Sequence, residues 1–306
     1  MARKVIGIGE TVFDIIFKND LPVSAVPGGS TFNSMISLGR CGVPAIFLSE
    51  TGDDHIGQTI CNYLESNGVS AADVDKNGKS HLSLAFLNEQ NDANYVFYKD
   101  HPHDKAEMRM PEINADDIVL FGSYYAINPV IRHKVKALLE YAREQGAIIY
   151  YDLNFRASHK DEAEILLPNI EENFRFADVV RGSNEDFEIV FSMKDFASVC
   201  NIESLKTKTL IYTCGAKETR LKTSGDLHIT HEVEPIDVVS TIGAGDNYNA
   251  GVIYSIMRDS ICREELLQGL TEEKWNTILS TAQSFSAECC RSFDNSVSME
   301  FAKKMR

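Results

Sequence analysis

The fold is decided by the stretch Ser240-Thr241-Ile242-Gly243-Ala244-Gly245-Asp246-Asn247-Tyr248-Asn249-Ala250-Gly251, which joins a glycine-rich turn, an acid and the start of a helix. The two glycines around Ala244 let a ligand approach the main chain closely. The first N–H groups of the helix that follows form an anion site. Because Asp246 would repel a bound phosphate, we expect it to accept a proton from a hydroxyl group that attacks phosphorus. The stretch therefore predicts a kinase that acts on a small alcohol.

The flanking residues complete this interpretation and leave one alternative. The preceding run Glu232–Val239 predicts an edge strand that leads into the turn, and apolar residues at helical spacing follow from Asn247 to Met257. A purely structural interpretation is that Asp246 caps the helix after a tight turn, since Asp is a favoured N-cap.

Two N-terminal segments carry a second pattern. The run Gly28-Gly29-Ser30-Thr31-Phe32-Asn33-Ser34-Met35-Ile36-Ser37-Leu38-Gly39 places a glycine pair before an asparagine and an amphipathic helix, and Gly52-Asp53-Asp54-His55-Ile56-Gly57 follows. Together with the C-terminal stretch, and in the same order, these segments resemble the ribokinase-like (PfkB) carbohydrate kinases. The opening Gly7–Asp14 is similar to that of the fructokinase-type members. The resemblance covers nearly the whole chain.

An α/β fold is expected from the alternation of short apolar runs with longer amphipathic ones. The resemblance implies a single ribokinase-like domain over residues 1–306, a three-layer sandwich whose mostly parallel central sheet is flanked by helices. The expected strands are Lys4–Gly9, Ala45–Ser49, Ile118–Gly122, Ala147–Asp152, Val179–Gly182 and Thr209–Thr213. The expected helices are Thr31–Arg40, His55–Ser66, Pro129–Gln145, Asp161–Asn173, Glu185–Phe191, Tyr248–Met257 and Glu273–Cys290.

One region departs from this alternation. The segments His81–Asn88 and Asn94–Lys99 predict a hairpin across a polar turn, and the extended segment Val12–Pro27 completes a small separate sheet. In the resembled family this sheet is a β lid over the sugar, here built from segments near 12–27 and 81–104, and it often forms a homodimer contact. An ordinary surface hairpin is the alternative.

The resemblance also assigns the chemistry. It implies that Asp246 is the general base and that the N–H groups of Gly243, Ala244 and Gly245 form the anion hole. The residues that it implies for the acceptor sugar are Asp14, Gly28, Gly29, Asn33 and Arg156. Structural roles remain as alternatives, because Asp14 suits a turn, Asn33 a helix cap and Arg156 a solvent-facing position.

For the nucleotide, the resemblance implies ATP with Mg²⁺ and contacts from Asn184, Thr213 and Gly215. Phe187 stands where the family has a glutamate, so the resemblance leaves Glu185, Asp186 or Glu188 to contact the metal through water, with Glu185 as the first candidate, or the nucleotide itself to hold most of the metal. Magnesium needs only one or two carboxylates, so this difference need not abolish binding. The family also usually has glycine at Glu218, which adds a negative charge here. Many members have aspartate at Ser240 to hold a monovalent cation, and we therefore do not expect activation by potassium.

Bulk composition excludes several partners. The chain has 306 residues with 30 basic and 45 acidic side chains, so its net charge of −15 argues against nucleic acid and anionic membranes as partners. No apolar run is long enough to cross a bilayer, and the start is too soon broken by glycine for a signal peptide. Seven cysteines without metal-type spacing indicate reduced thiols and a cytoplasmic protein.

We therefore expect an ATP-dependent kinase for a hydroxymethyl group of a small, fructose-like sugar. Ribose, ketodeoxygluconate or nucleoside acceptors are alternatives within the same family. A non-catalytic sensor of sugar or nucleotide is another, which the differences at Phe187 and Ser240 keep open. A nicotinamide-dependent oxidoreductase is rejected, because the third glycine of the fingerprint that begins at Gly7 would fall at Val12.

Overall fold

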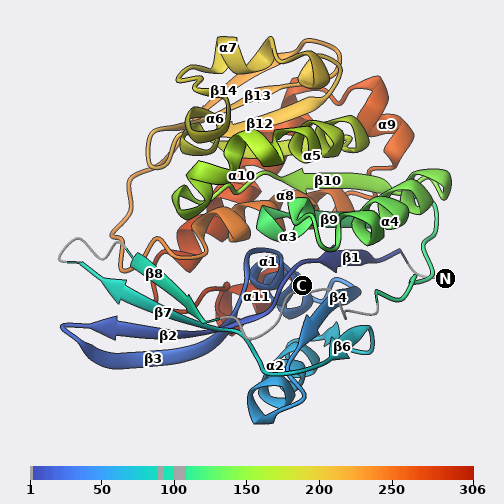
Figure 1. Cartoon of the computed structure of the whole chain (residues 1–306). Helices are drawn as coiled ribbons and strands as arrows, with labels where there is room; N and C mark the ends of the chain where they lie inside the picture. Colours follow the sequence, from blue (N-terminus) through green and yellow to red (C-terminus); the bar gives the residue numbers. More distant parts are fainter. Residues whose placement is uncertain (1–2, 89–92, 99–107) are drawn as a thin grey trace. The chain divides into compact units, whose positions relative to one another are not determined.

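The computed structural model describes residues 3–88, 93–98 and 108–306 (Figure 1). The chain forms two compact units. The first unit comprises Met1–Pro111, Ile236–Tyr254 and Ala282–Arg306, and the second comprises Glu112–Pro235 and Ser255–Thr281. The prediction of a single domain over residues 1–306 stays a prediction.

The first unit contains parallel strands in the order β1-β4-β5, and β6 also pairs with β4. Their bounds are β1 (Val5–Ile8), β4 (Ala45–Thr51), β5 (Val69–Ser70) and β6 (Val74–Lys76). The helices that lie wholly in this unit are α1 (Ser30–Arg40), α2 (His55–Ser66) and α11 (Met299–Met305). The side chain of Phe32 in α1 meets Phe47 in β4 edge to face, at 5.7 Å between ring centroids, so this helix is part of the core.

A second, four-stranded sheet in the first unit confirms the predicted hairpin and separate sheet. Its order is β3-β2-β7-β8, with β2 and β7 parallel and the other pairs antiparallel. The strands are β2 (Val12–Lys18), β3 (Leu21–Gly28), β7 (Leu82–Leu87) and β8 (Ala93–Tyr98). Residues 89–92, in the predicted turn of the hairpin, and residues 99–104 of the predicted lid lie outside the described residues.

The second unit contains the order β9-β10-β11-β12-β13-β14, in which the first four strands are parallel and the last two antiparallel. The strands are β9 (Ile118–Gly122), β10 (Ile148–Asp152), β11 (Val179–Ser183), β12 (Thr209–Thr213), β13 (Glu218–Lys222) and β14 (His228–Glu232). Every residue of β9, β10 and β12 is buried, so their apolar runs were recognisable in the sequence.

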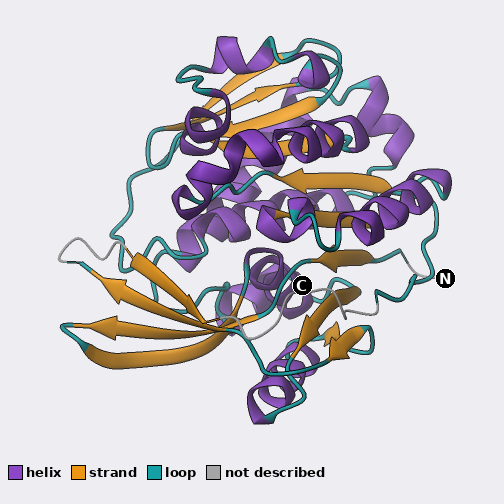
Figure 2. Ribbon diagram, viewed as in Figure 1, coloured by secondary structure: helices purple, strands orange, loops and turns teal. Residues whose placement is uncertain are grey.

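Helices accompany these strands, and Figure 2 distinguishes the two kinds of element. The helices of the second unit are α3 (Ser123–Ile127), α4 (Arg132–Glu144), α5 (Ala163–Phe176), α6 (Asn184–Phe191), α7 (Phe196–Cys200) and α9 (Arg263–Gln268), with 3₁₀ helices η2 (Ala157–Glu162) and η3 (Glu203–Leu205). The chain passes between the units within α8 (Ala244–Arg258) and α10 (Glu272–Cys289). Phe174 of α5 contacts Tyr151 of β10, so aromatic rings join helix to sheet.

The predicted edge strand at Glu232–Val239 is wrong. Strand β14 ends at Glu232, and the residues from Val233 to Val239 are irregular. Pro235 has no N–H to give to a ladder, and the Val239 N–H donates to the Cys290 carbonyl oxygen at 2.8 Å. Within the described part of the chain, no helix has the length and apolar character that a membrane span needs.

Candidate active site

Asp246 is the third residue of α8, and its buried carboxylate is held by α1. Ser30 Oγ donates to Asp246 Oδ1 at 2.8 Å, and Asn33 Nδ2 donates to Asp246 Oδ2 at 2.8 Å. The structure thus brings together the predicted base and a predicted sugar residue. It does not support the capping alternatives, because α8 begins before Asp246 and the N-cap of α1 is Gly29.

Further hydroxyl groups of α1 hold the same segment. Ser34 Oγ donates to the main-chain carbonyl of Asp246 at 2.7 Å, and Ser37 Oγ donates to Asn247 Oδ1 at 2.5 Å. Residues three and four apart share one face of a helix, so Ser30, Ser34 and Ser37 form one polar stripe facing Asp246. Sequence reasoning missed these serines, although their spacing on an otherwise apolar helix was a usable signal.

The turn before Asp246 has the geometry of an anion site with two donors. Gly243 has a φ of 80°, and a Cβ there would lie 2.8 Å from the main-chain oxygen of Asn295, so only glycine fits. The Ala244 N–H donates to the Thr241 carbonyl oxygen at 3.2 Å. Within the described residues, the N–H groups of Gly243 and Gly245 donate to no protein acceptor, and both residues are half-exposed. These two groups, more than Ala244, are therefore available to an anion.

Asp14 lies within β2, on the buried face of the small sheet, and not in a turn. A Cβ at Gly28 would lie 2.1 Å from Asp14 Oδ2, so glycine at this position lets the carboxylate lie against the main chain. Asn295 Nδ2 donates to the same oxygen at 3.3 Å. Gly29 follows with a φ of 133°, which directs the chain into α1. Asp14, Gly28 and Gly29, three of the residues predicted for the sugar, are thus neighbours in the structure.

A separate polar group lies in the second unit, at the carboxyl ends of its parallel strands, where open α/β sheets bind ligands. Arg181 Nη1 donates to Asp152 Oδ1 at 3.1 Å, and Arg181 Nη2 donates to Thr213 Oγ1 at 2.9 Å. Burial would lower the pKa of Arg181, but the carboxylates of Asp152 and Asp186 outweigh burial and raise it. Arg181 therefore stays charged. The Thr213 hydroxyl oxygen accepts the hydrogen bond from Arg181, so this hydroxyl can still donate its own proton to another group.

The segment after β11 begins with a capping box. Ser183 is the N-cap of α6, its hydroxyl accepts from the Asp186 N–H, and Asp186 Oδ2 accepts from the Ser183 N–H at 2.6 Å. Asp186 Oδ1 accepts from the Phe155 N–H at 2.8 Å. Asn184 is the first residue of α6, and Glu185 is exposed. Sequence reasoning also missed the spacing of Ser183 and Asp186, which is a capping signature.

The other predicted residues of the second unit lie on its surface. Arg156 is exposed and is the N-cap of η2. Gly215 is exposed, with a φ of 55° and open space beside its Cα. The additional charge of Glu218 is paired, because Arg220 Nε donates to Glu218 Oε1 at 2.6 Å. The glycine-to-glutamate difference thus adds no unpaired negative charge at this loop.

No group of three or more His, Cys, Asp or Glu side chains within the described ranges is arranged to hold a metal ion. Glu185 has an exposed carboxylate, whereas both oxygens of Asp186 accept hydrogen bonds from the protein. This arrangement fits a magnesium ion that is held mainly by phosphate oxygens and water, because Mg²⁺ usually keeps several waters.

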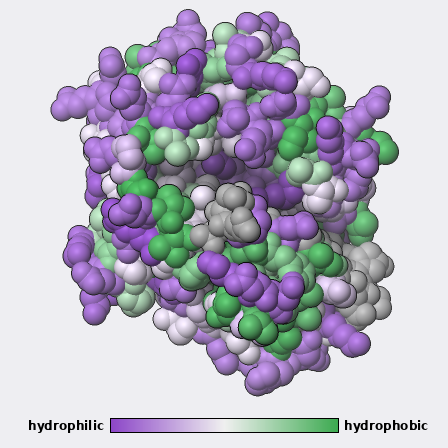
Figure 3. Space-filling model, turned by 90° about the vertical axis from the view of Figure 1, so that its left-hand side faces the viewer, coloured by the Kyte–Doolittle hydropathy of each residue, from purple (hydrophilic) through white to green (hydrophobic). Residues whose placement is uncertain are grey.

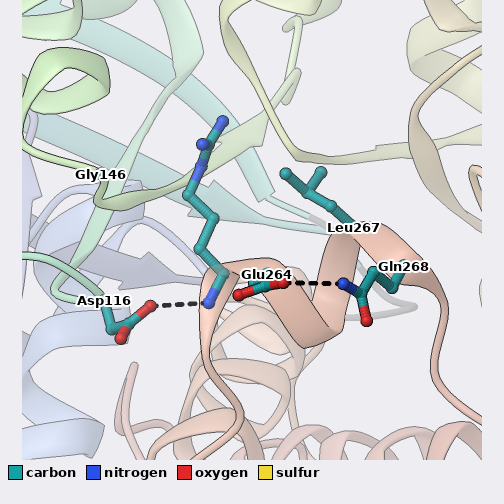
Figure 4. Close-up of a pocket in the computed structure, with 6 residues that line it drawn as sticks. Asp116, Gly146, Glu264, Leu267 and Gln268 are labelled. Carbon is teal, nitrogen blue, oxygen red and sulfur yellow. Dashed lines mark hydrogen bonds between the residues drawn. The ribbon is translucent and has the colours of Figure 1, made fainter.

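A surface pocket in the second unit lies away from this group (Figure 4). Its lining residues are Asp116, Gly146, Arg263, Glu264, Leu267 and Gln268. Asp116 precedes β9 and Gly146 precedes β10, so the pocket lies at the amino ends of the parallel strands. The Arg263 guanidinium is committed to Asp178, at 2.8 and 2.9 Å. The pocket is therefore not the candidate active site.

Comparison with known proteins identifies a matching family and several relatives of this chain. A family model described as pfkB family carbohydrate kinase matches residues 2–297. The 5-dehydro-2-deoxygluconokinase of Geobacillus thermodenitrificans is 31% identical over 252 residues, which are 75% of this chain and 72% of that protein. The probable fructokinase-2 of Arabidopsis thaliana is 26% identical over 269 residues, which are 85% of this chain and 80% of that protein.

Among solved structures, the fructokinase of Vibrio cholerae O395 in its fructose-, ADP- and calcium-bound form has a TM-score of 0.85 to this chain at 16% identity. The match covers 99% of this chain and 98% of that one. The predicted fold is thereby confirmed: a mixed, mostly parallel sheet flanked by helices, with a second small sheet.

Proposed function

The chain belongs to the pfkB family of carbohydrate kinases and is a sugar kinase, and from this premise we propose that it is an ATP-dependent, fructokinase-like enzyme that phosphorylates a hydroxymethyl group. The observation that carries the proposal is the placement of Asp246. Its carboxylate is oriented by Ser30 and Asn33 directly after the Gly243–Gly245 turn.

Asp246 has the chemistry of a general base in this position. Each of its oxygens accepts one hydrogen bond from α1, and a carboxylate oxygen has lone pairs enough to accept a second, from an acceptor hydroxyl group. The N–H groups of Gly243 and Gly245 would stabilise negative charge on the transferring phosphoryl group. ATP, bound with Mg²⁺, supplies that phosphoryl group. We propose that Ala244 contributes by keeping the turn closed, since its N–H donates to Thr241.

For the acceptor we propose contacts from Asp14, Asn33 and the glycine pair Gly28-Gly29. All of these residues lie in the first unit with Asp246, and Asp14 and Asn33 are buried. Arg156, which is exposed on the second unit, is proposed to bind a phosphate or substrate oxygen through its forked donors.

For the nucleotide we propose contacts from Thr213, Gly215 and Asn184, all in the second unit. The hydroxyl oxygen of Thr213 accepts from Arg181, which leaves its proton for a phosphate oxygen. Gly215 has open space beside it, so a ligand can approach its main chain. Glu185 is proposed to contact Mg²⁺ through water.

A sugar acid is the second candidate acceptor. The observation in its favour is the 31% identity to a 5-dehydro-2-deoxygluconokinase, compared with 26% to the plant fructokinase. Ribose and nucleosides remain candidate acceptors as well. A sensor without catalysis is disfavoured, because a protein that only binds has no need of an oriented base at Asp246.

We also propose a homodimer through the lid, the four-stranded sheet β3-β2-β7-β8. One face of β2 and β7 carries only half-exposed apolar side chains: Phe13, Ile15, Phe17, Leu82, Leu84 and Phe86. Val96 and Tyr98 on β8 extend this apolar face and are exposed. Figure 3 views the side toward which these strands point in Figure 1 and shows hydrophobic residues gathered on its lower half. A second lid would cover such a face.

The proposal is tested by measuring ADP release with ATP and Mg²⁺ over a panel of neutral sugars, sugar acids and nucleosides. We expect turnover with one acceptor class, which Asp246→Asn reduces at least about 100-fold, in line with general-base removal. Asp195→Asn is the matched control, because Asn also caps a helix and Asp195 caps α7 on the surface. Equal turnover by Asp246→Asn and wild type would contradict the assignment.

A further inference from the structure

Three buried side-chain atoms of the first unit have no hydrogen-bond partner within the described residues: Asn33 Oδ1, Asn295 Oδ1 and Ser83 Oγ. Asn33 and Asn295 are each 5% exposed, and Ser83 is 0% exposed. Buried polar atoms are nearly always paired, because an unpaired one loses its hydrogen bonds to water and gains none in return. A bound ligand would supply the partners that these three atoms lack.

All three atoms belong to residues that adjoin the two carboxylates of the candidate active site. Asn33 donates to Asp246, and Asn295 donates to Asp14. Ser83 is the register partner of Asp14 on the neighbouring strand, and the two side chains lie on the same buried face of the sheet. The unpaired atoms therefore accompany the predicted acceptor residues.

Asn295 has a second connection, to the anion turn. Its main-chain oxygen accepts from Asn247 Nδ2 at 2.9 Å, and the same amide nitrogen donates to the Gly243 carbonyl oxygen at 2.8 Å. The side chain of Asn295 thus meets the acceptor residue Asp14, while its main chain braces the turn that precedes Asp246. Asn295 was not among the residues that the sequence pointed to.

Hydrogen-bond chemistry identifies the kind of ligand. The amide oxygens of Asn33 and Asn295 accept but do not donate, as do the carboxylates, whereas the Ser83 hydroxyl can do both. A molecule with neighbouring hydroxyl groups supplies the donors that the oxygens lack. A carboxylate supplies no donor, and beside Asp14 and Asp246 it would add a third negative charge.

We propose that Asn295 and Ser83 are sugar-binding residues that, with Asn33, select a neutral polyhydroxy sugar over a sugar acid. This inference rests on the proposed function, because it concerns the acceptor of the same site. It assigns to Asn295 Oδ1 a hydrogen bond from one sugar hydroxyl group and to Ser83 Oγ a hydrogen bond with another.

The test separates ligand binding from folding. Ser83→Ala removes an unpaired buried hydroxyl, so we expect the melting temperature without sugar to stay the same or to rise. Binding of D-fructose, measured by calorimetry with a non-hydrolysable ATP analogue present, should weaken about tenfold. Ser204→Ala is the matched control, since Ser204 Oγ is also buried without a partner in the described part of the chain but lies in η3 of the second unit. It should leave sugar binding unchanged.

A second variant tests Asn295 directly. Asn295→Asp keeps the shape but faces Asp14 with a like charge, so we expect sugar binding to weaken at least tenfold while the ATP analogue binds as to wild type. Asn201→Asp, at the exposed end of α7, serves as its control. Wild-type fructose affinity in both Ser83→Ala and Asn295→Asp would overturn the inference.

The relative affinity of the wild-type protein for neutral and acidic sugars provides a third test. The protein should bind D-fructose or another neutral sugar more tightly than ketodeoxygluconate, and the opposite order, or no binding of any neutral sugar, would overturn the inference. Failure of the proposed function would look different from failure of this inference. The protein would bind sugar, but no turnover that is lost in Asp246→Asn would be measured. Turnover of a sugar acid alone would keep the kinase and refute the selectivity.

Discussion

Asn33 Nδ2 lies 2.8 Å from Asp246 Oδ2, although 213 positions separate the two residues in the sequence. Ser30 binds the other carboxylate oxygen at the same distance. The two bonds give the carboxylate one orientation relative to α1, which a general base needs for efficient proton transfer.

Ser30→Ala should therefore lower kcat. The variant leaves Asp246 charged but with one orienting bond less, and we expect about a tenfold loss, less than for removal of the base itself. Steady-state kinetics with the best acceptor measures it. Ser66→Ala is the control, because Ser66 donates from the exposed end of α2 to Tyr63. An unchanged kcat in Ser30→Ala would show that Asn33 alone is sufficient to orient the base.

Gly243→Ala should abolish most activity. The new Cβ would meet the Asn295 main-chain oxygen at 2.8 Å, and the φ of 80° is unfavourable for alanine. The turn must shift, which displaces the Gly243 and Gly245 donors, and loss of such a donor lowers kcat by about 100-fold. Gly269→Ala also has a positive φ, 106°, with open space around it and no role in the proposed site, so it measures backbone strain alone. Equal effects of the two variants would argue against an anion site at Gly243.

The sequence predicted the buried elements better than the exposed ones. Strands β9 and β12 and helix α2 were predicted with their observed bounds, because the burial of their apolar residues leaves a clear pattern in the sequence. Strands β13 and β14 were missed, since each has a single apolar residue, Leu221 or Ile229, among charged and polar ones. The strand at Glu232–Val239 was wrongly predicted because valine favours strands. In the structure, Pro235 and the main-chain hydrogen bond from Val239 to Cys290 outweigh this propensity.

The candidate active site likewise contains residues that the sequence identified and one, Asn295, that it did not. Asp246 and Asn33 were identifiable from local patterns around each of them, and the structure joins them. Asn295 was not identifiable, because nothing in its local sequence marks it, and its contact with Asp14 spans 281 positions. Such contacts arise from tertiary packing, which a single sequence does not encode in any short pattern.

Activity should not depend on potassium. Ser240 Oγ accepts from the Ile242 N–H at 3.2 Å and carries no charge for a cation. The Cys289 thiol can donate a hydrogen bond to the Ile242 carbonyl oxygen, at 3.3 Å, or to the Asp294 carbonyl oxygen, at 3.5 Å. Burial, with Cys290 and Asp246 nearby, raises the pKa of Cys289, so the donor proton is kept. Rates in potassium and choline chloride at equal ionic strength should agree, and a several-fold stimulation by potassium would contradict this.

The Asp54 cap of α2 should make stability depend on acid pH. Burial would raise the pKa of Asp54, but hydrogen bonds from Ser80 and Gly57 outweigh it and hold the pKa below 3.8. A pKa that is lower in the folded state stabilises the protein above the unfolded value, about 4, and the contribution is lost as the pH falls through the folded pKa.

Asp54→Ala should therefore lower the free energy of unfolding at pH 7 by about 1 kcal/mol, the usual cost of losing an N-cap. Urea denaturation at a series of pH values measures it, with Asp53→Ala as the control at an exposed neighbour. The difference from wild type should shrink below about pH 4. A difference that stays constant down to about pH 3 would mean that the charge of Asp54 contributes nothing.

The lid face should hold two copies together. Phe17 and Phe86 stack on it at 5.0 Å between ring centroids, and Leu84 pairs with Ile15 beside them, so a charge placed there would be desolvated on association. Sedimentation equilibrium of the wild type should give twice 34.1 kDa, and Leu84→Asp should give a single chain. Ile165→Asp is the control, because Ile165 is exposed on α5 of the second unit. A wild type that sediments at 34.1 kDa at micromolar concentration would contradict the proposed dimer.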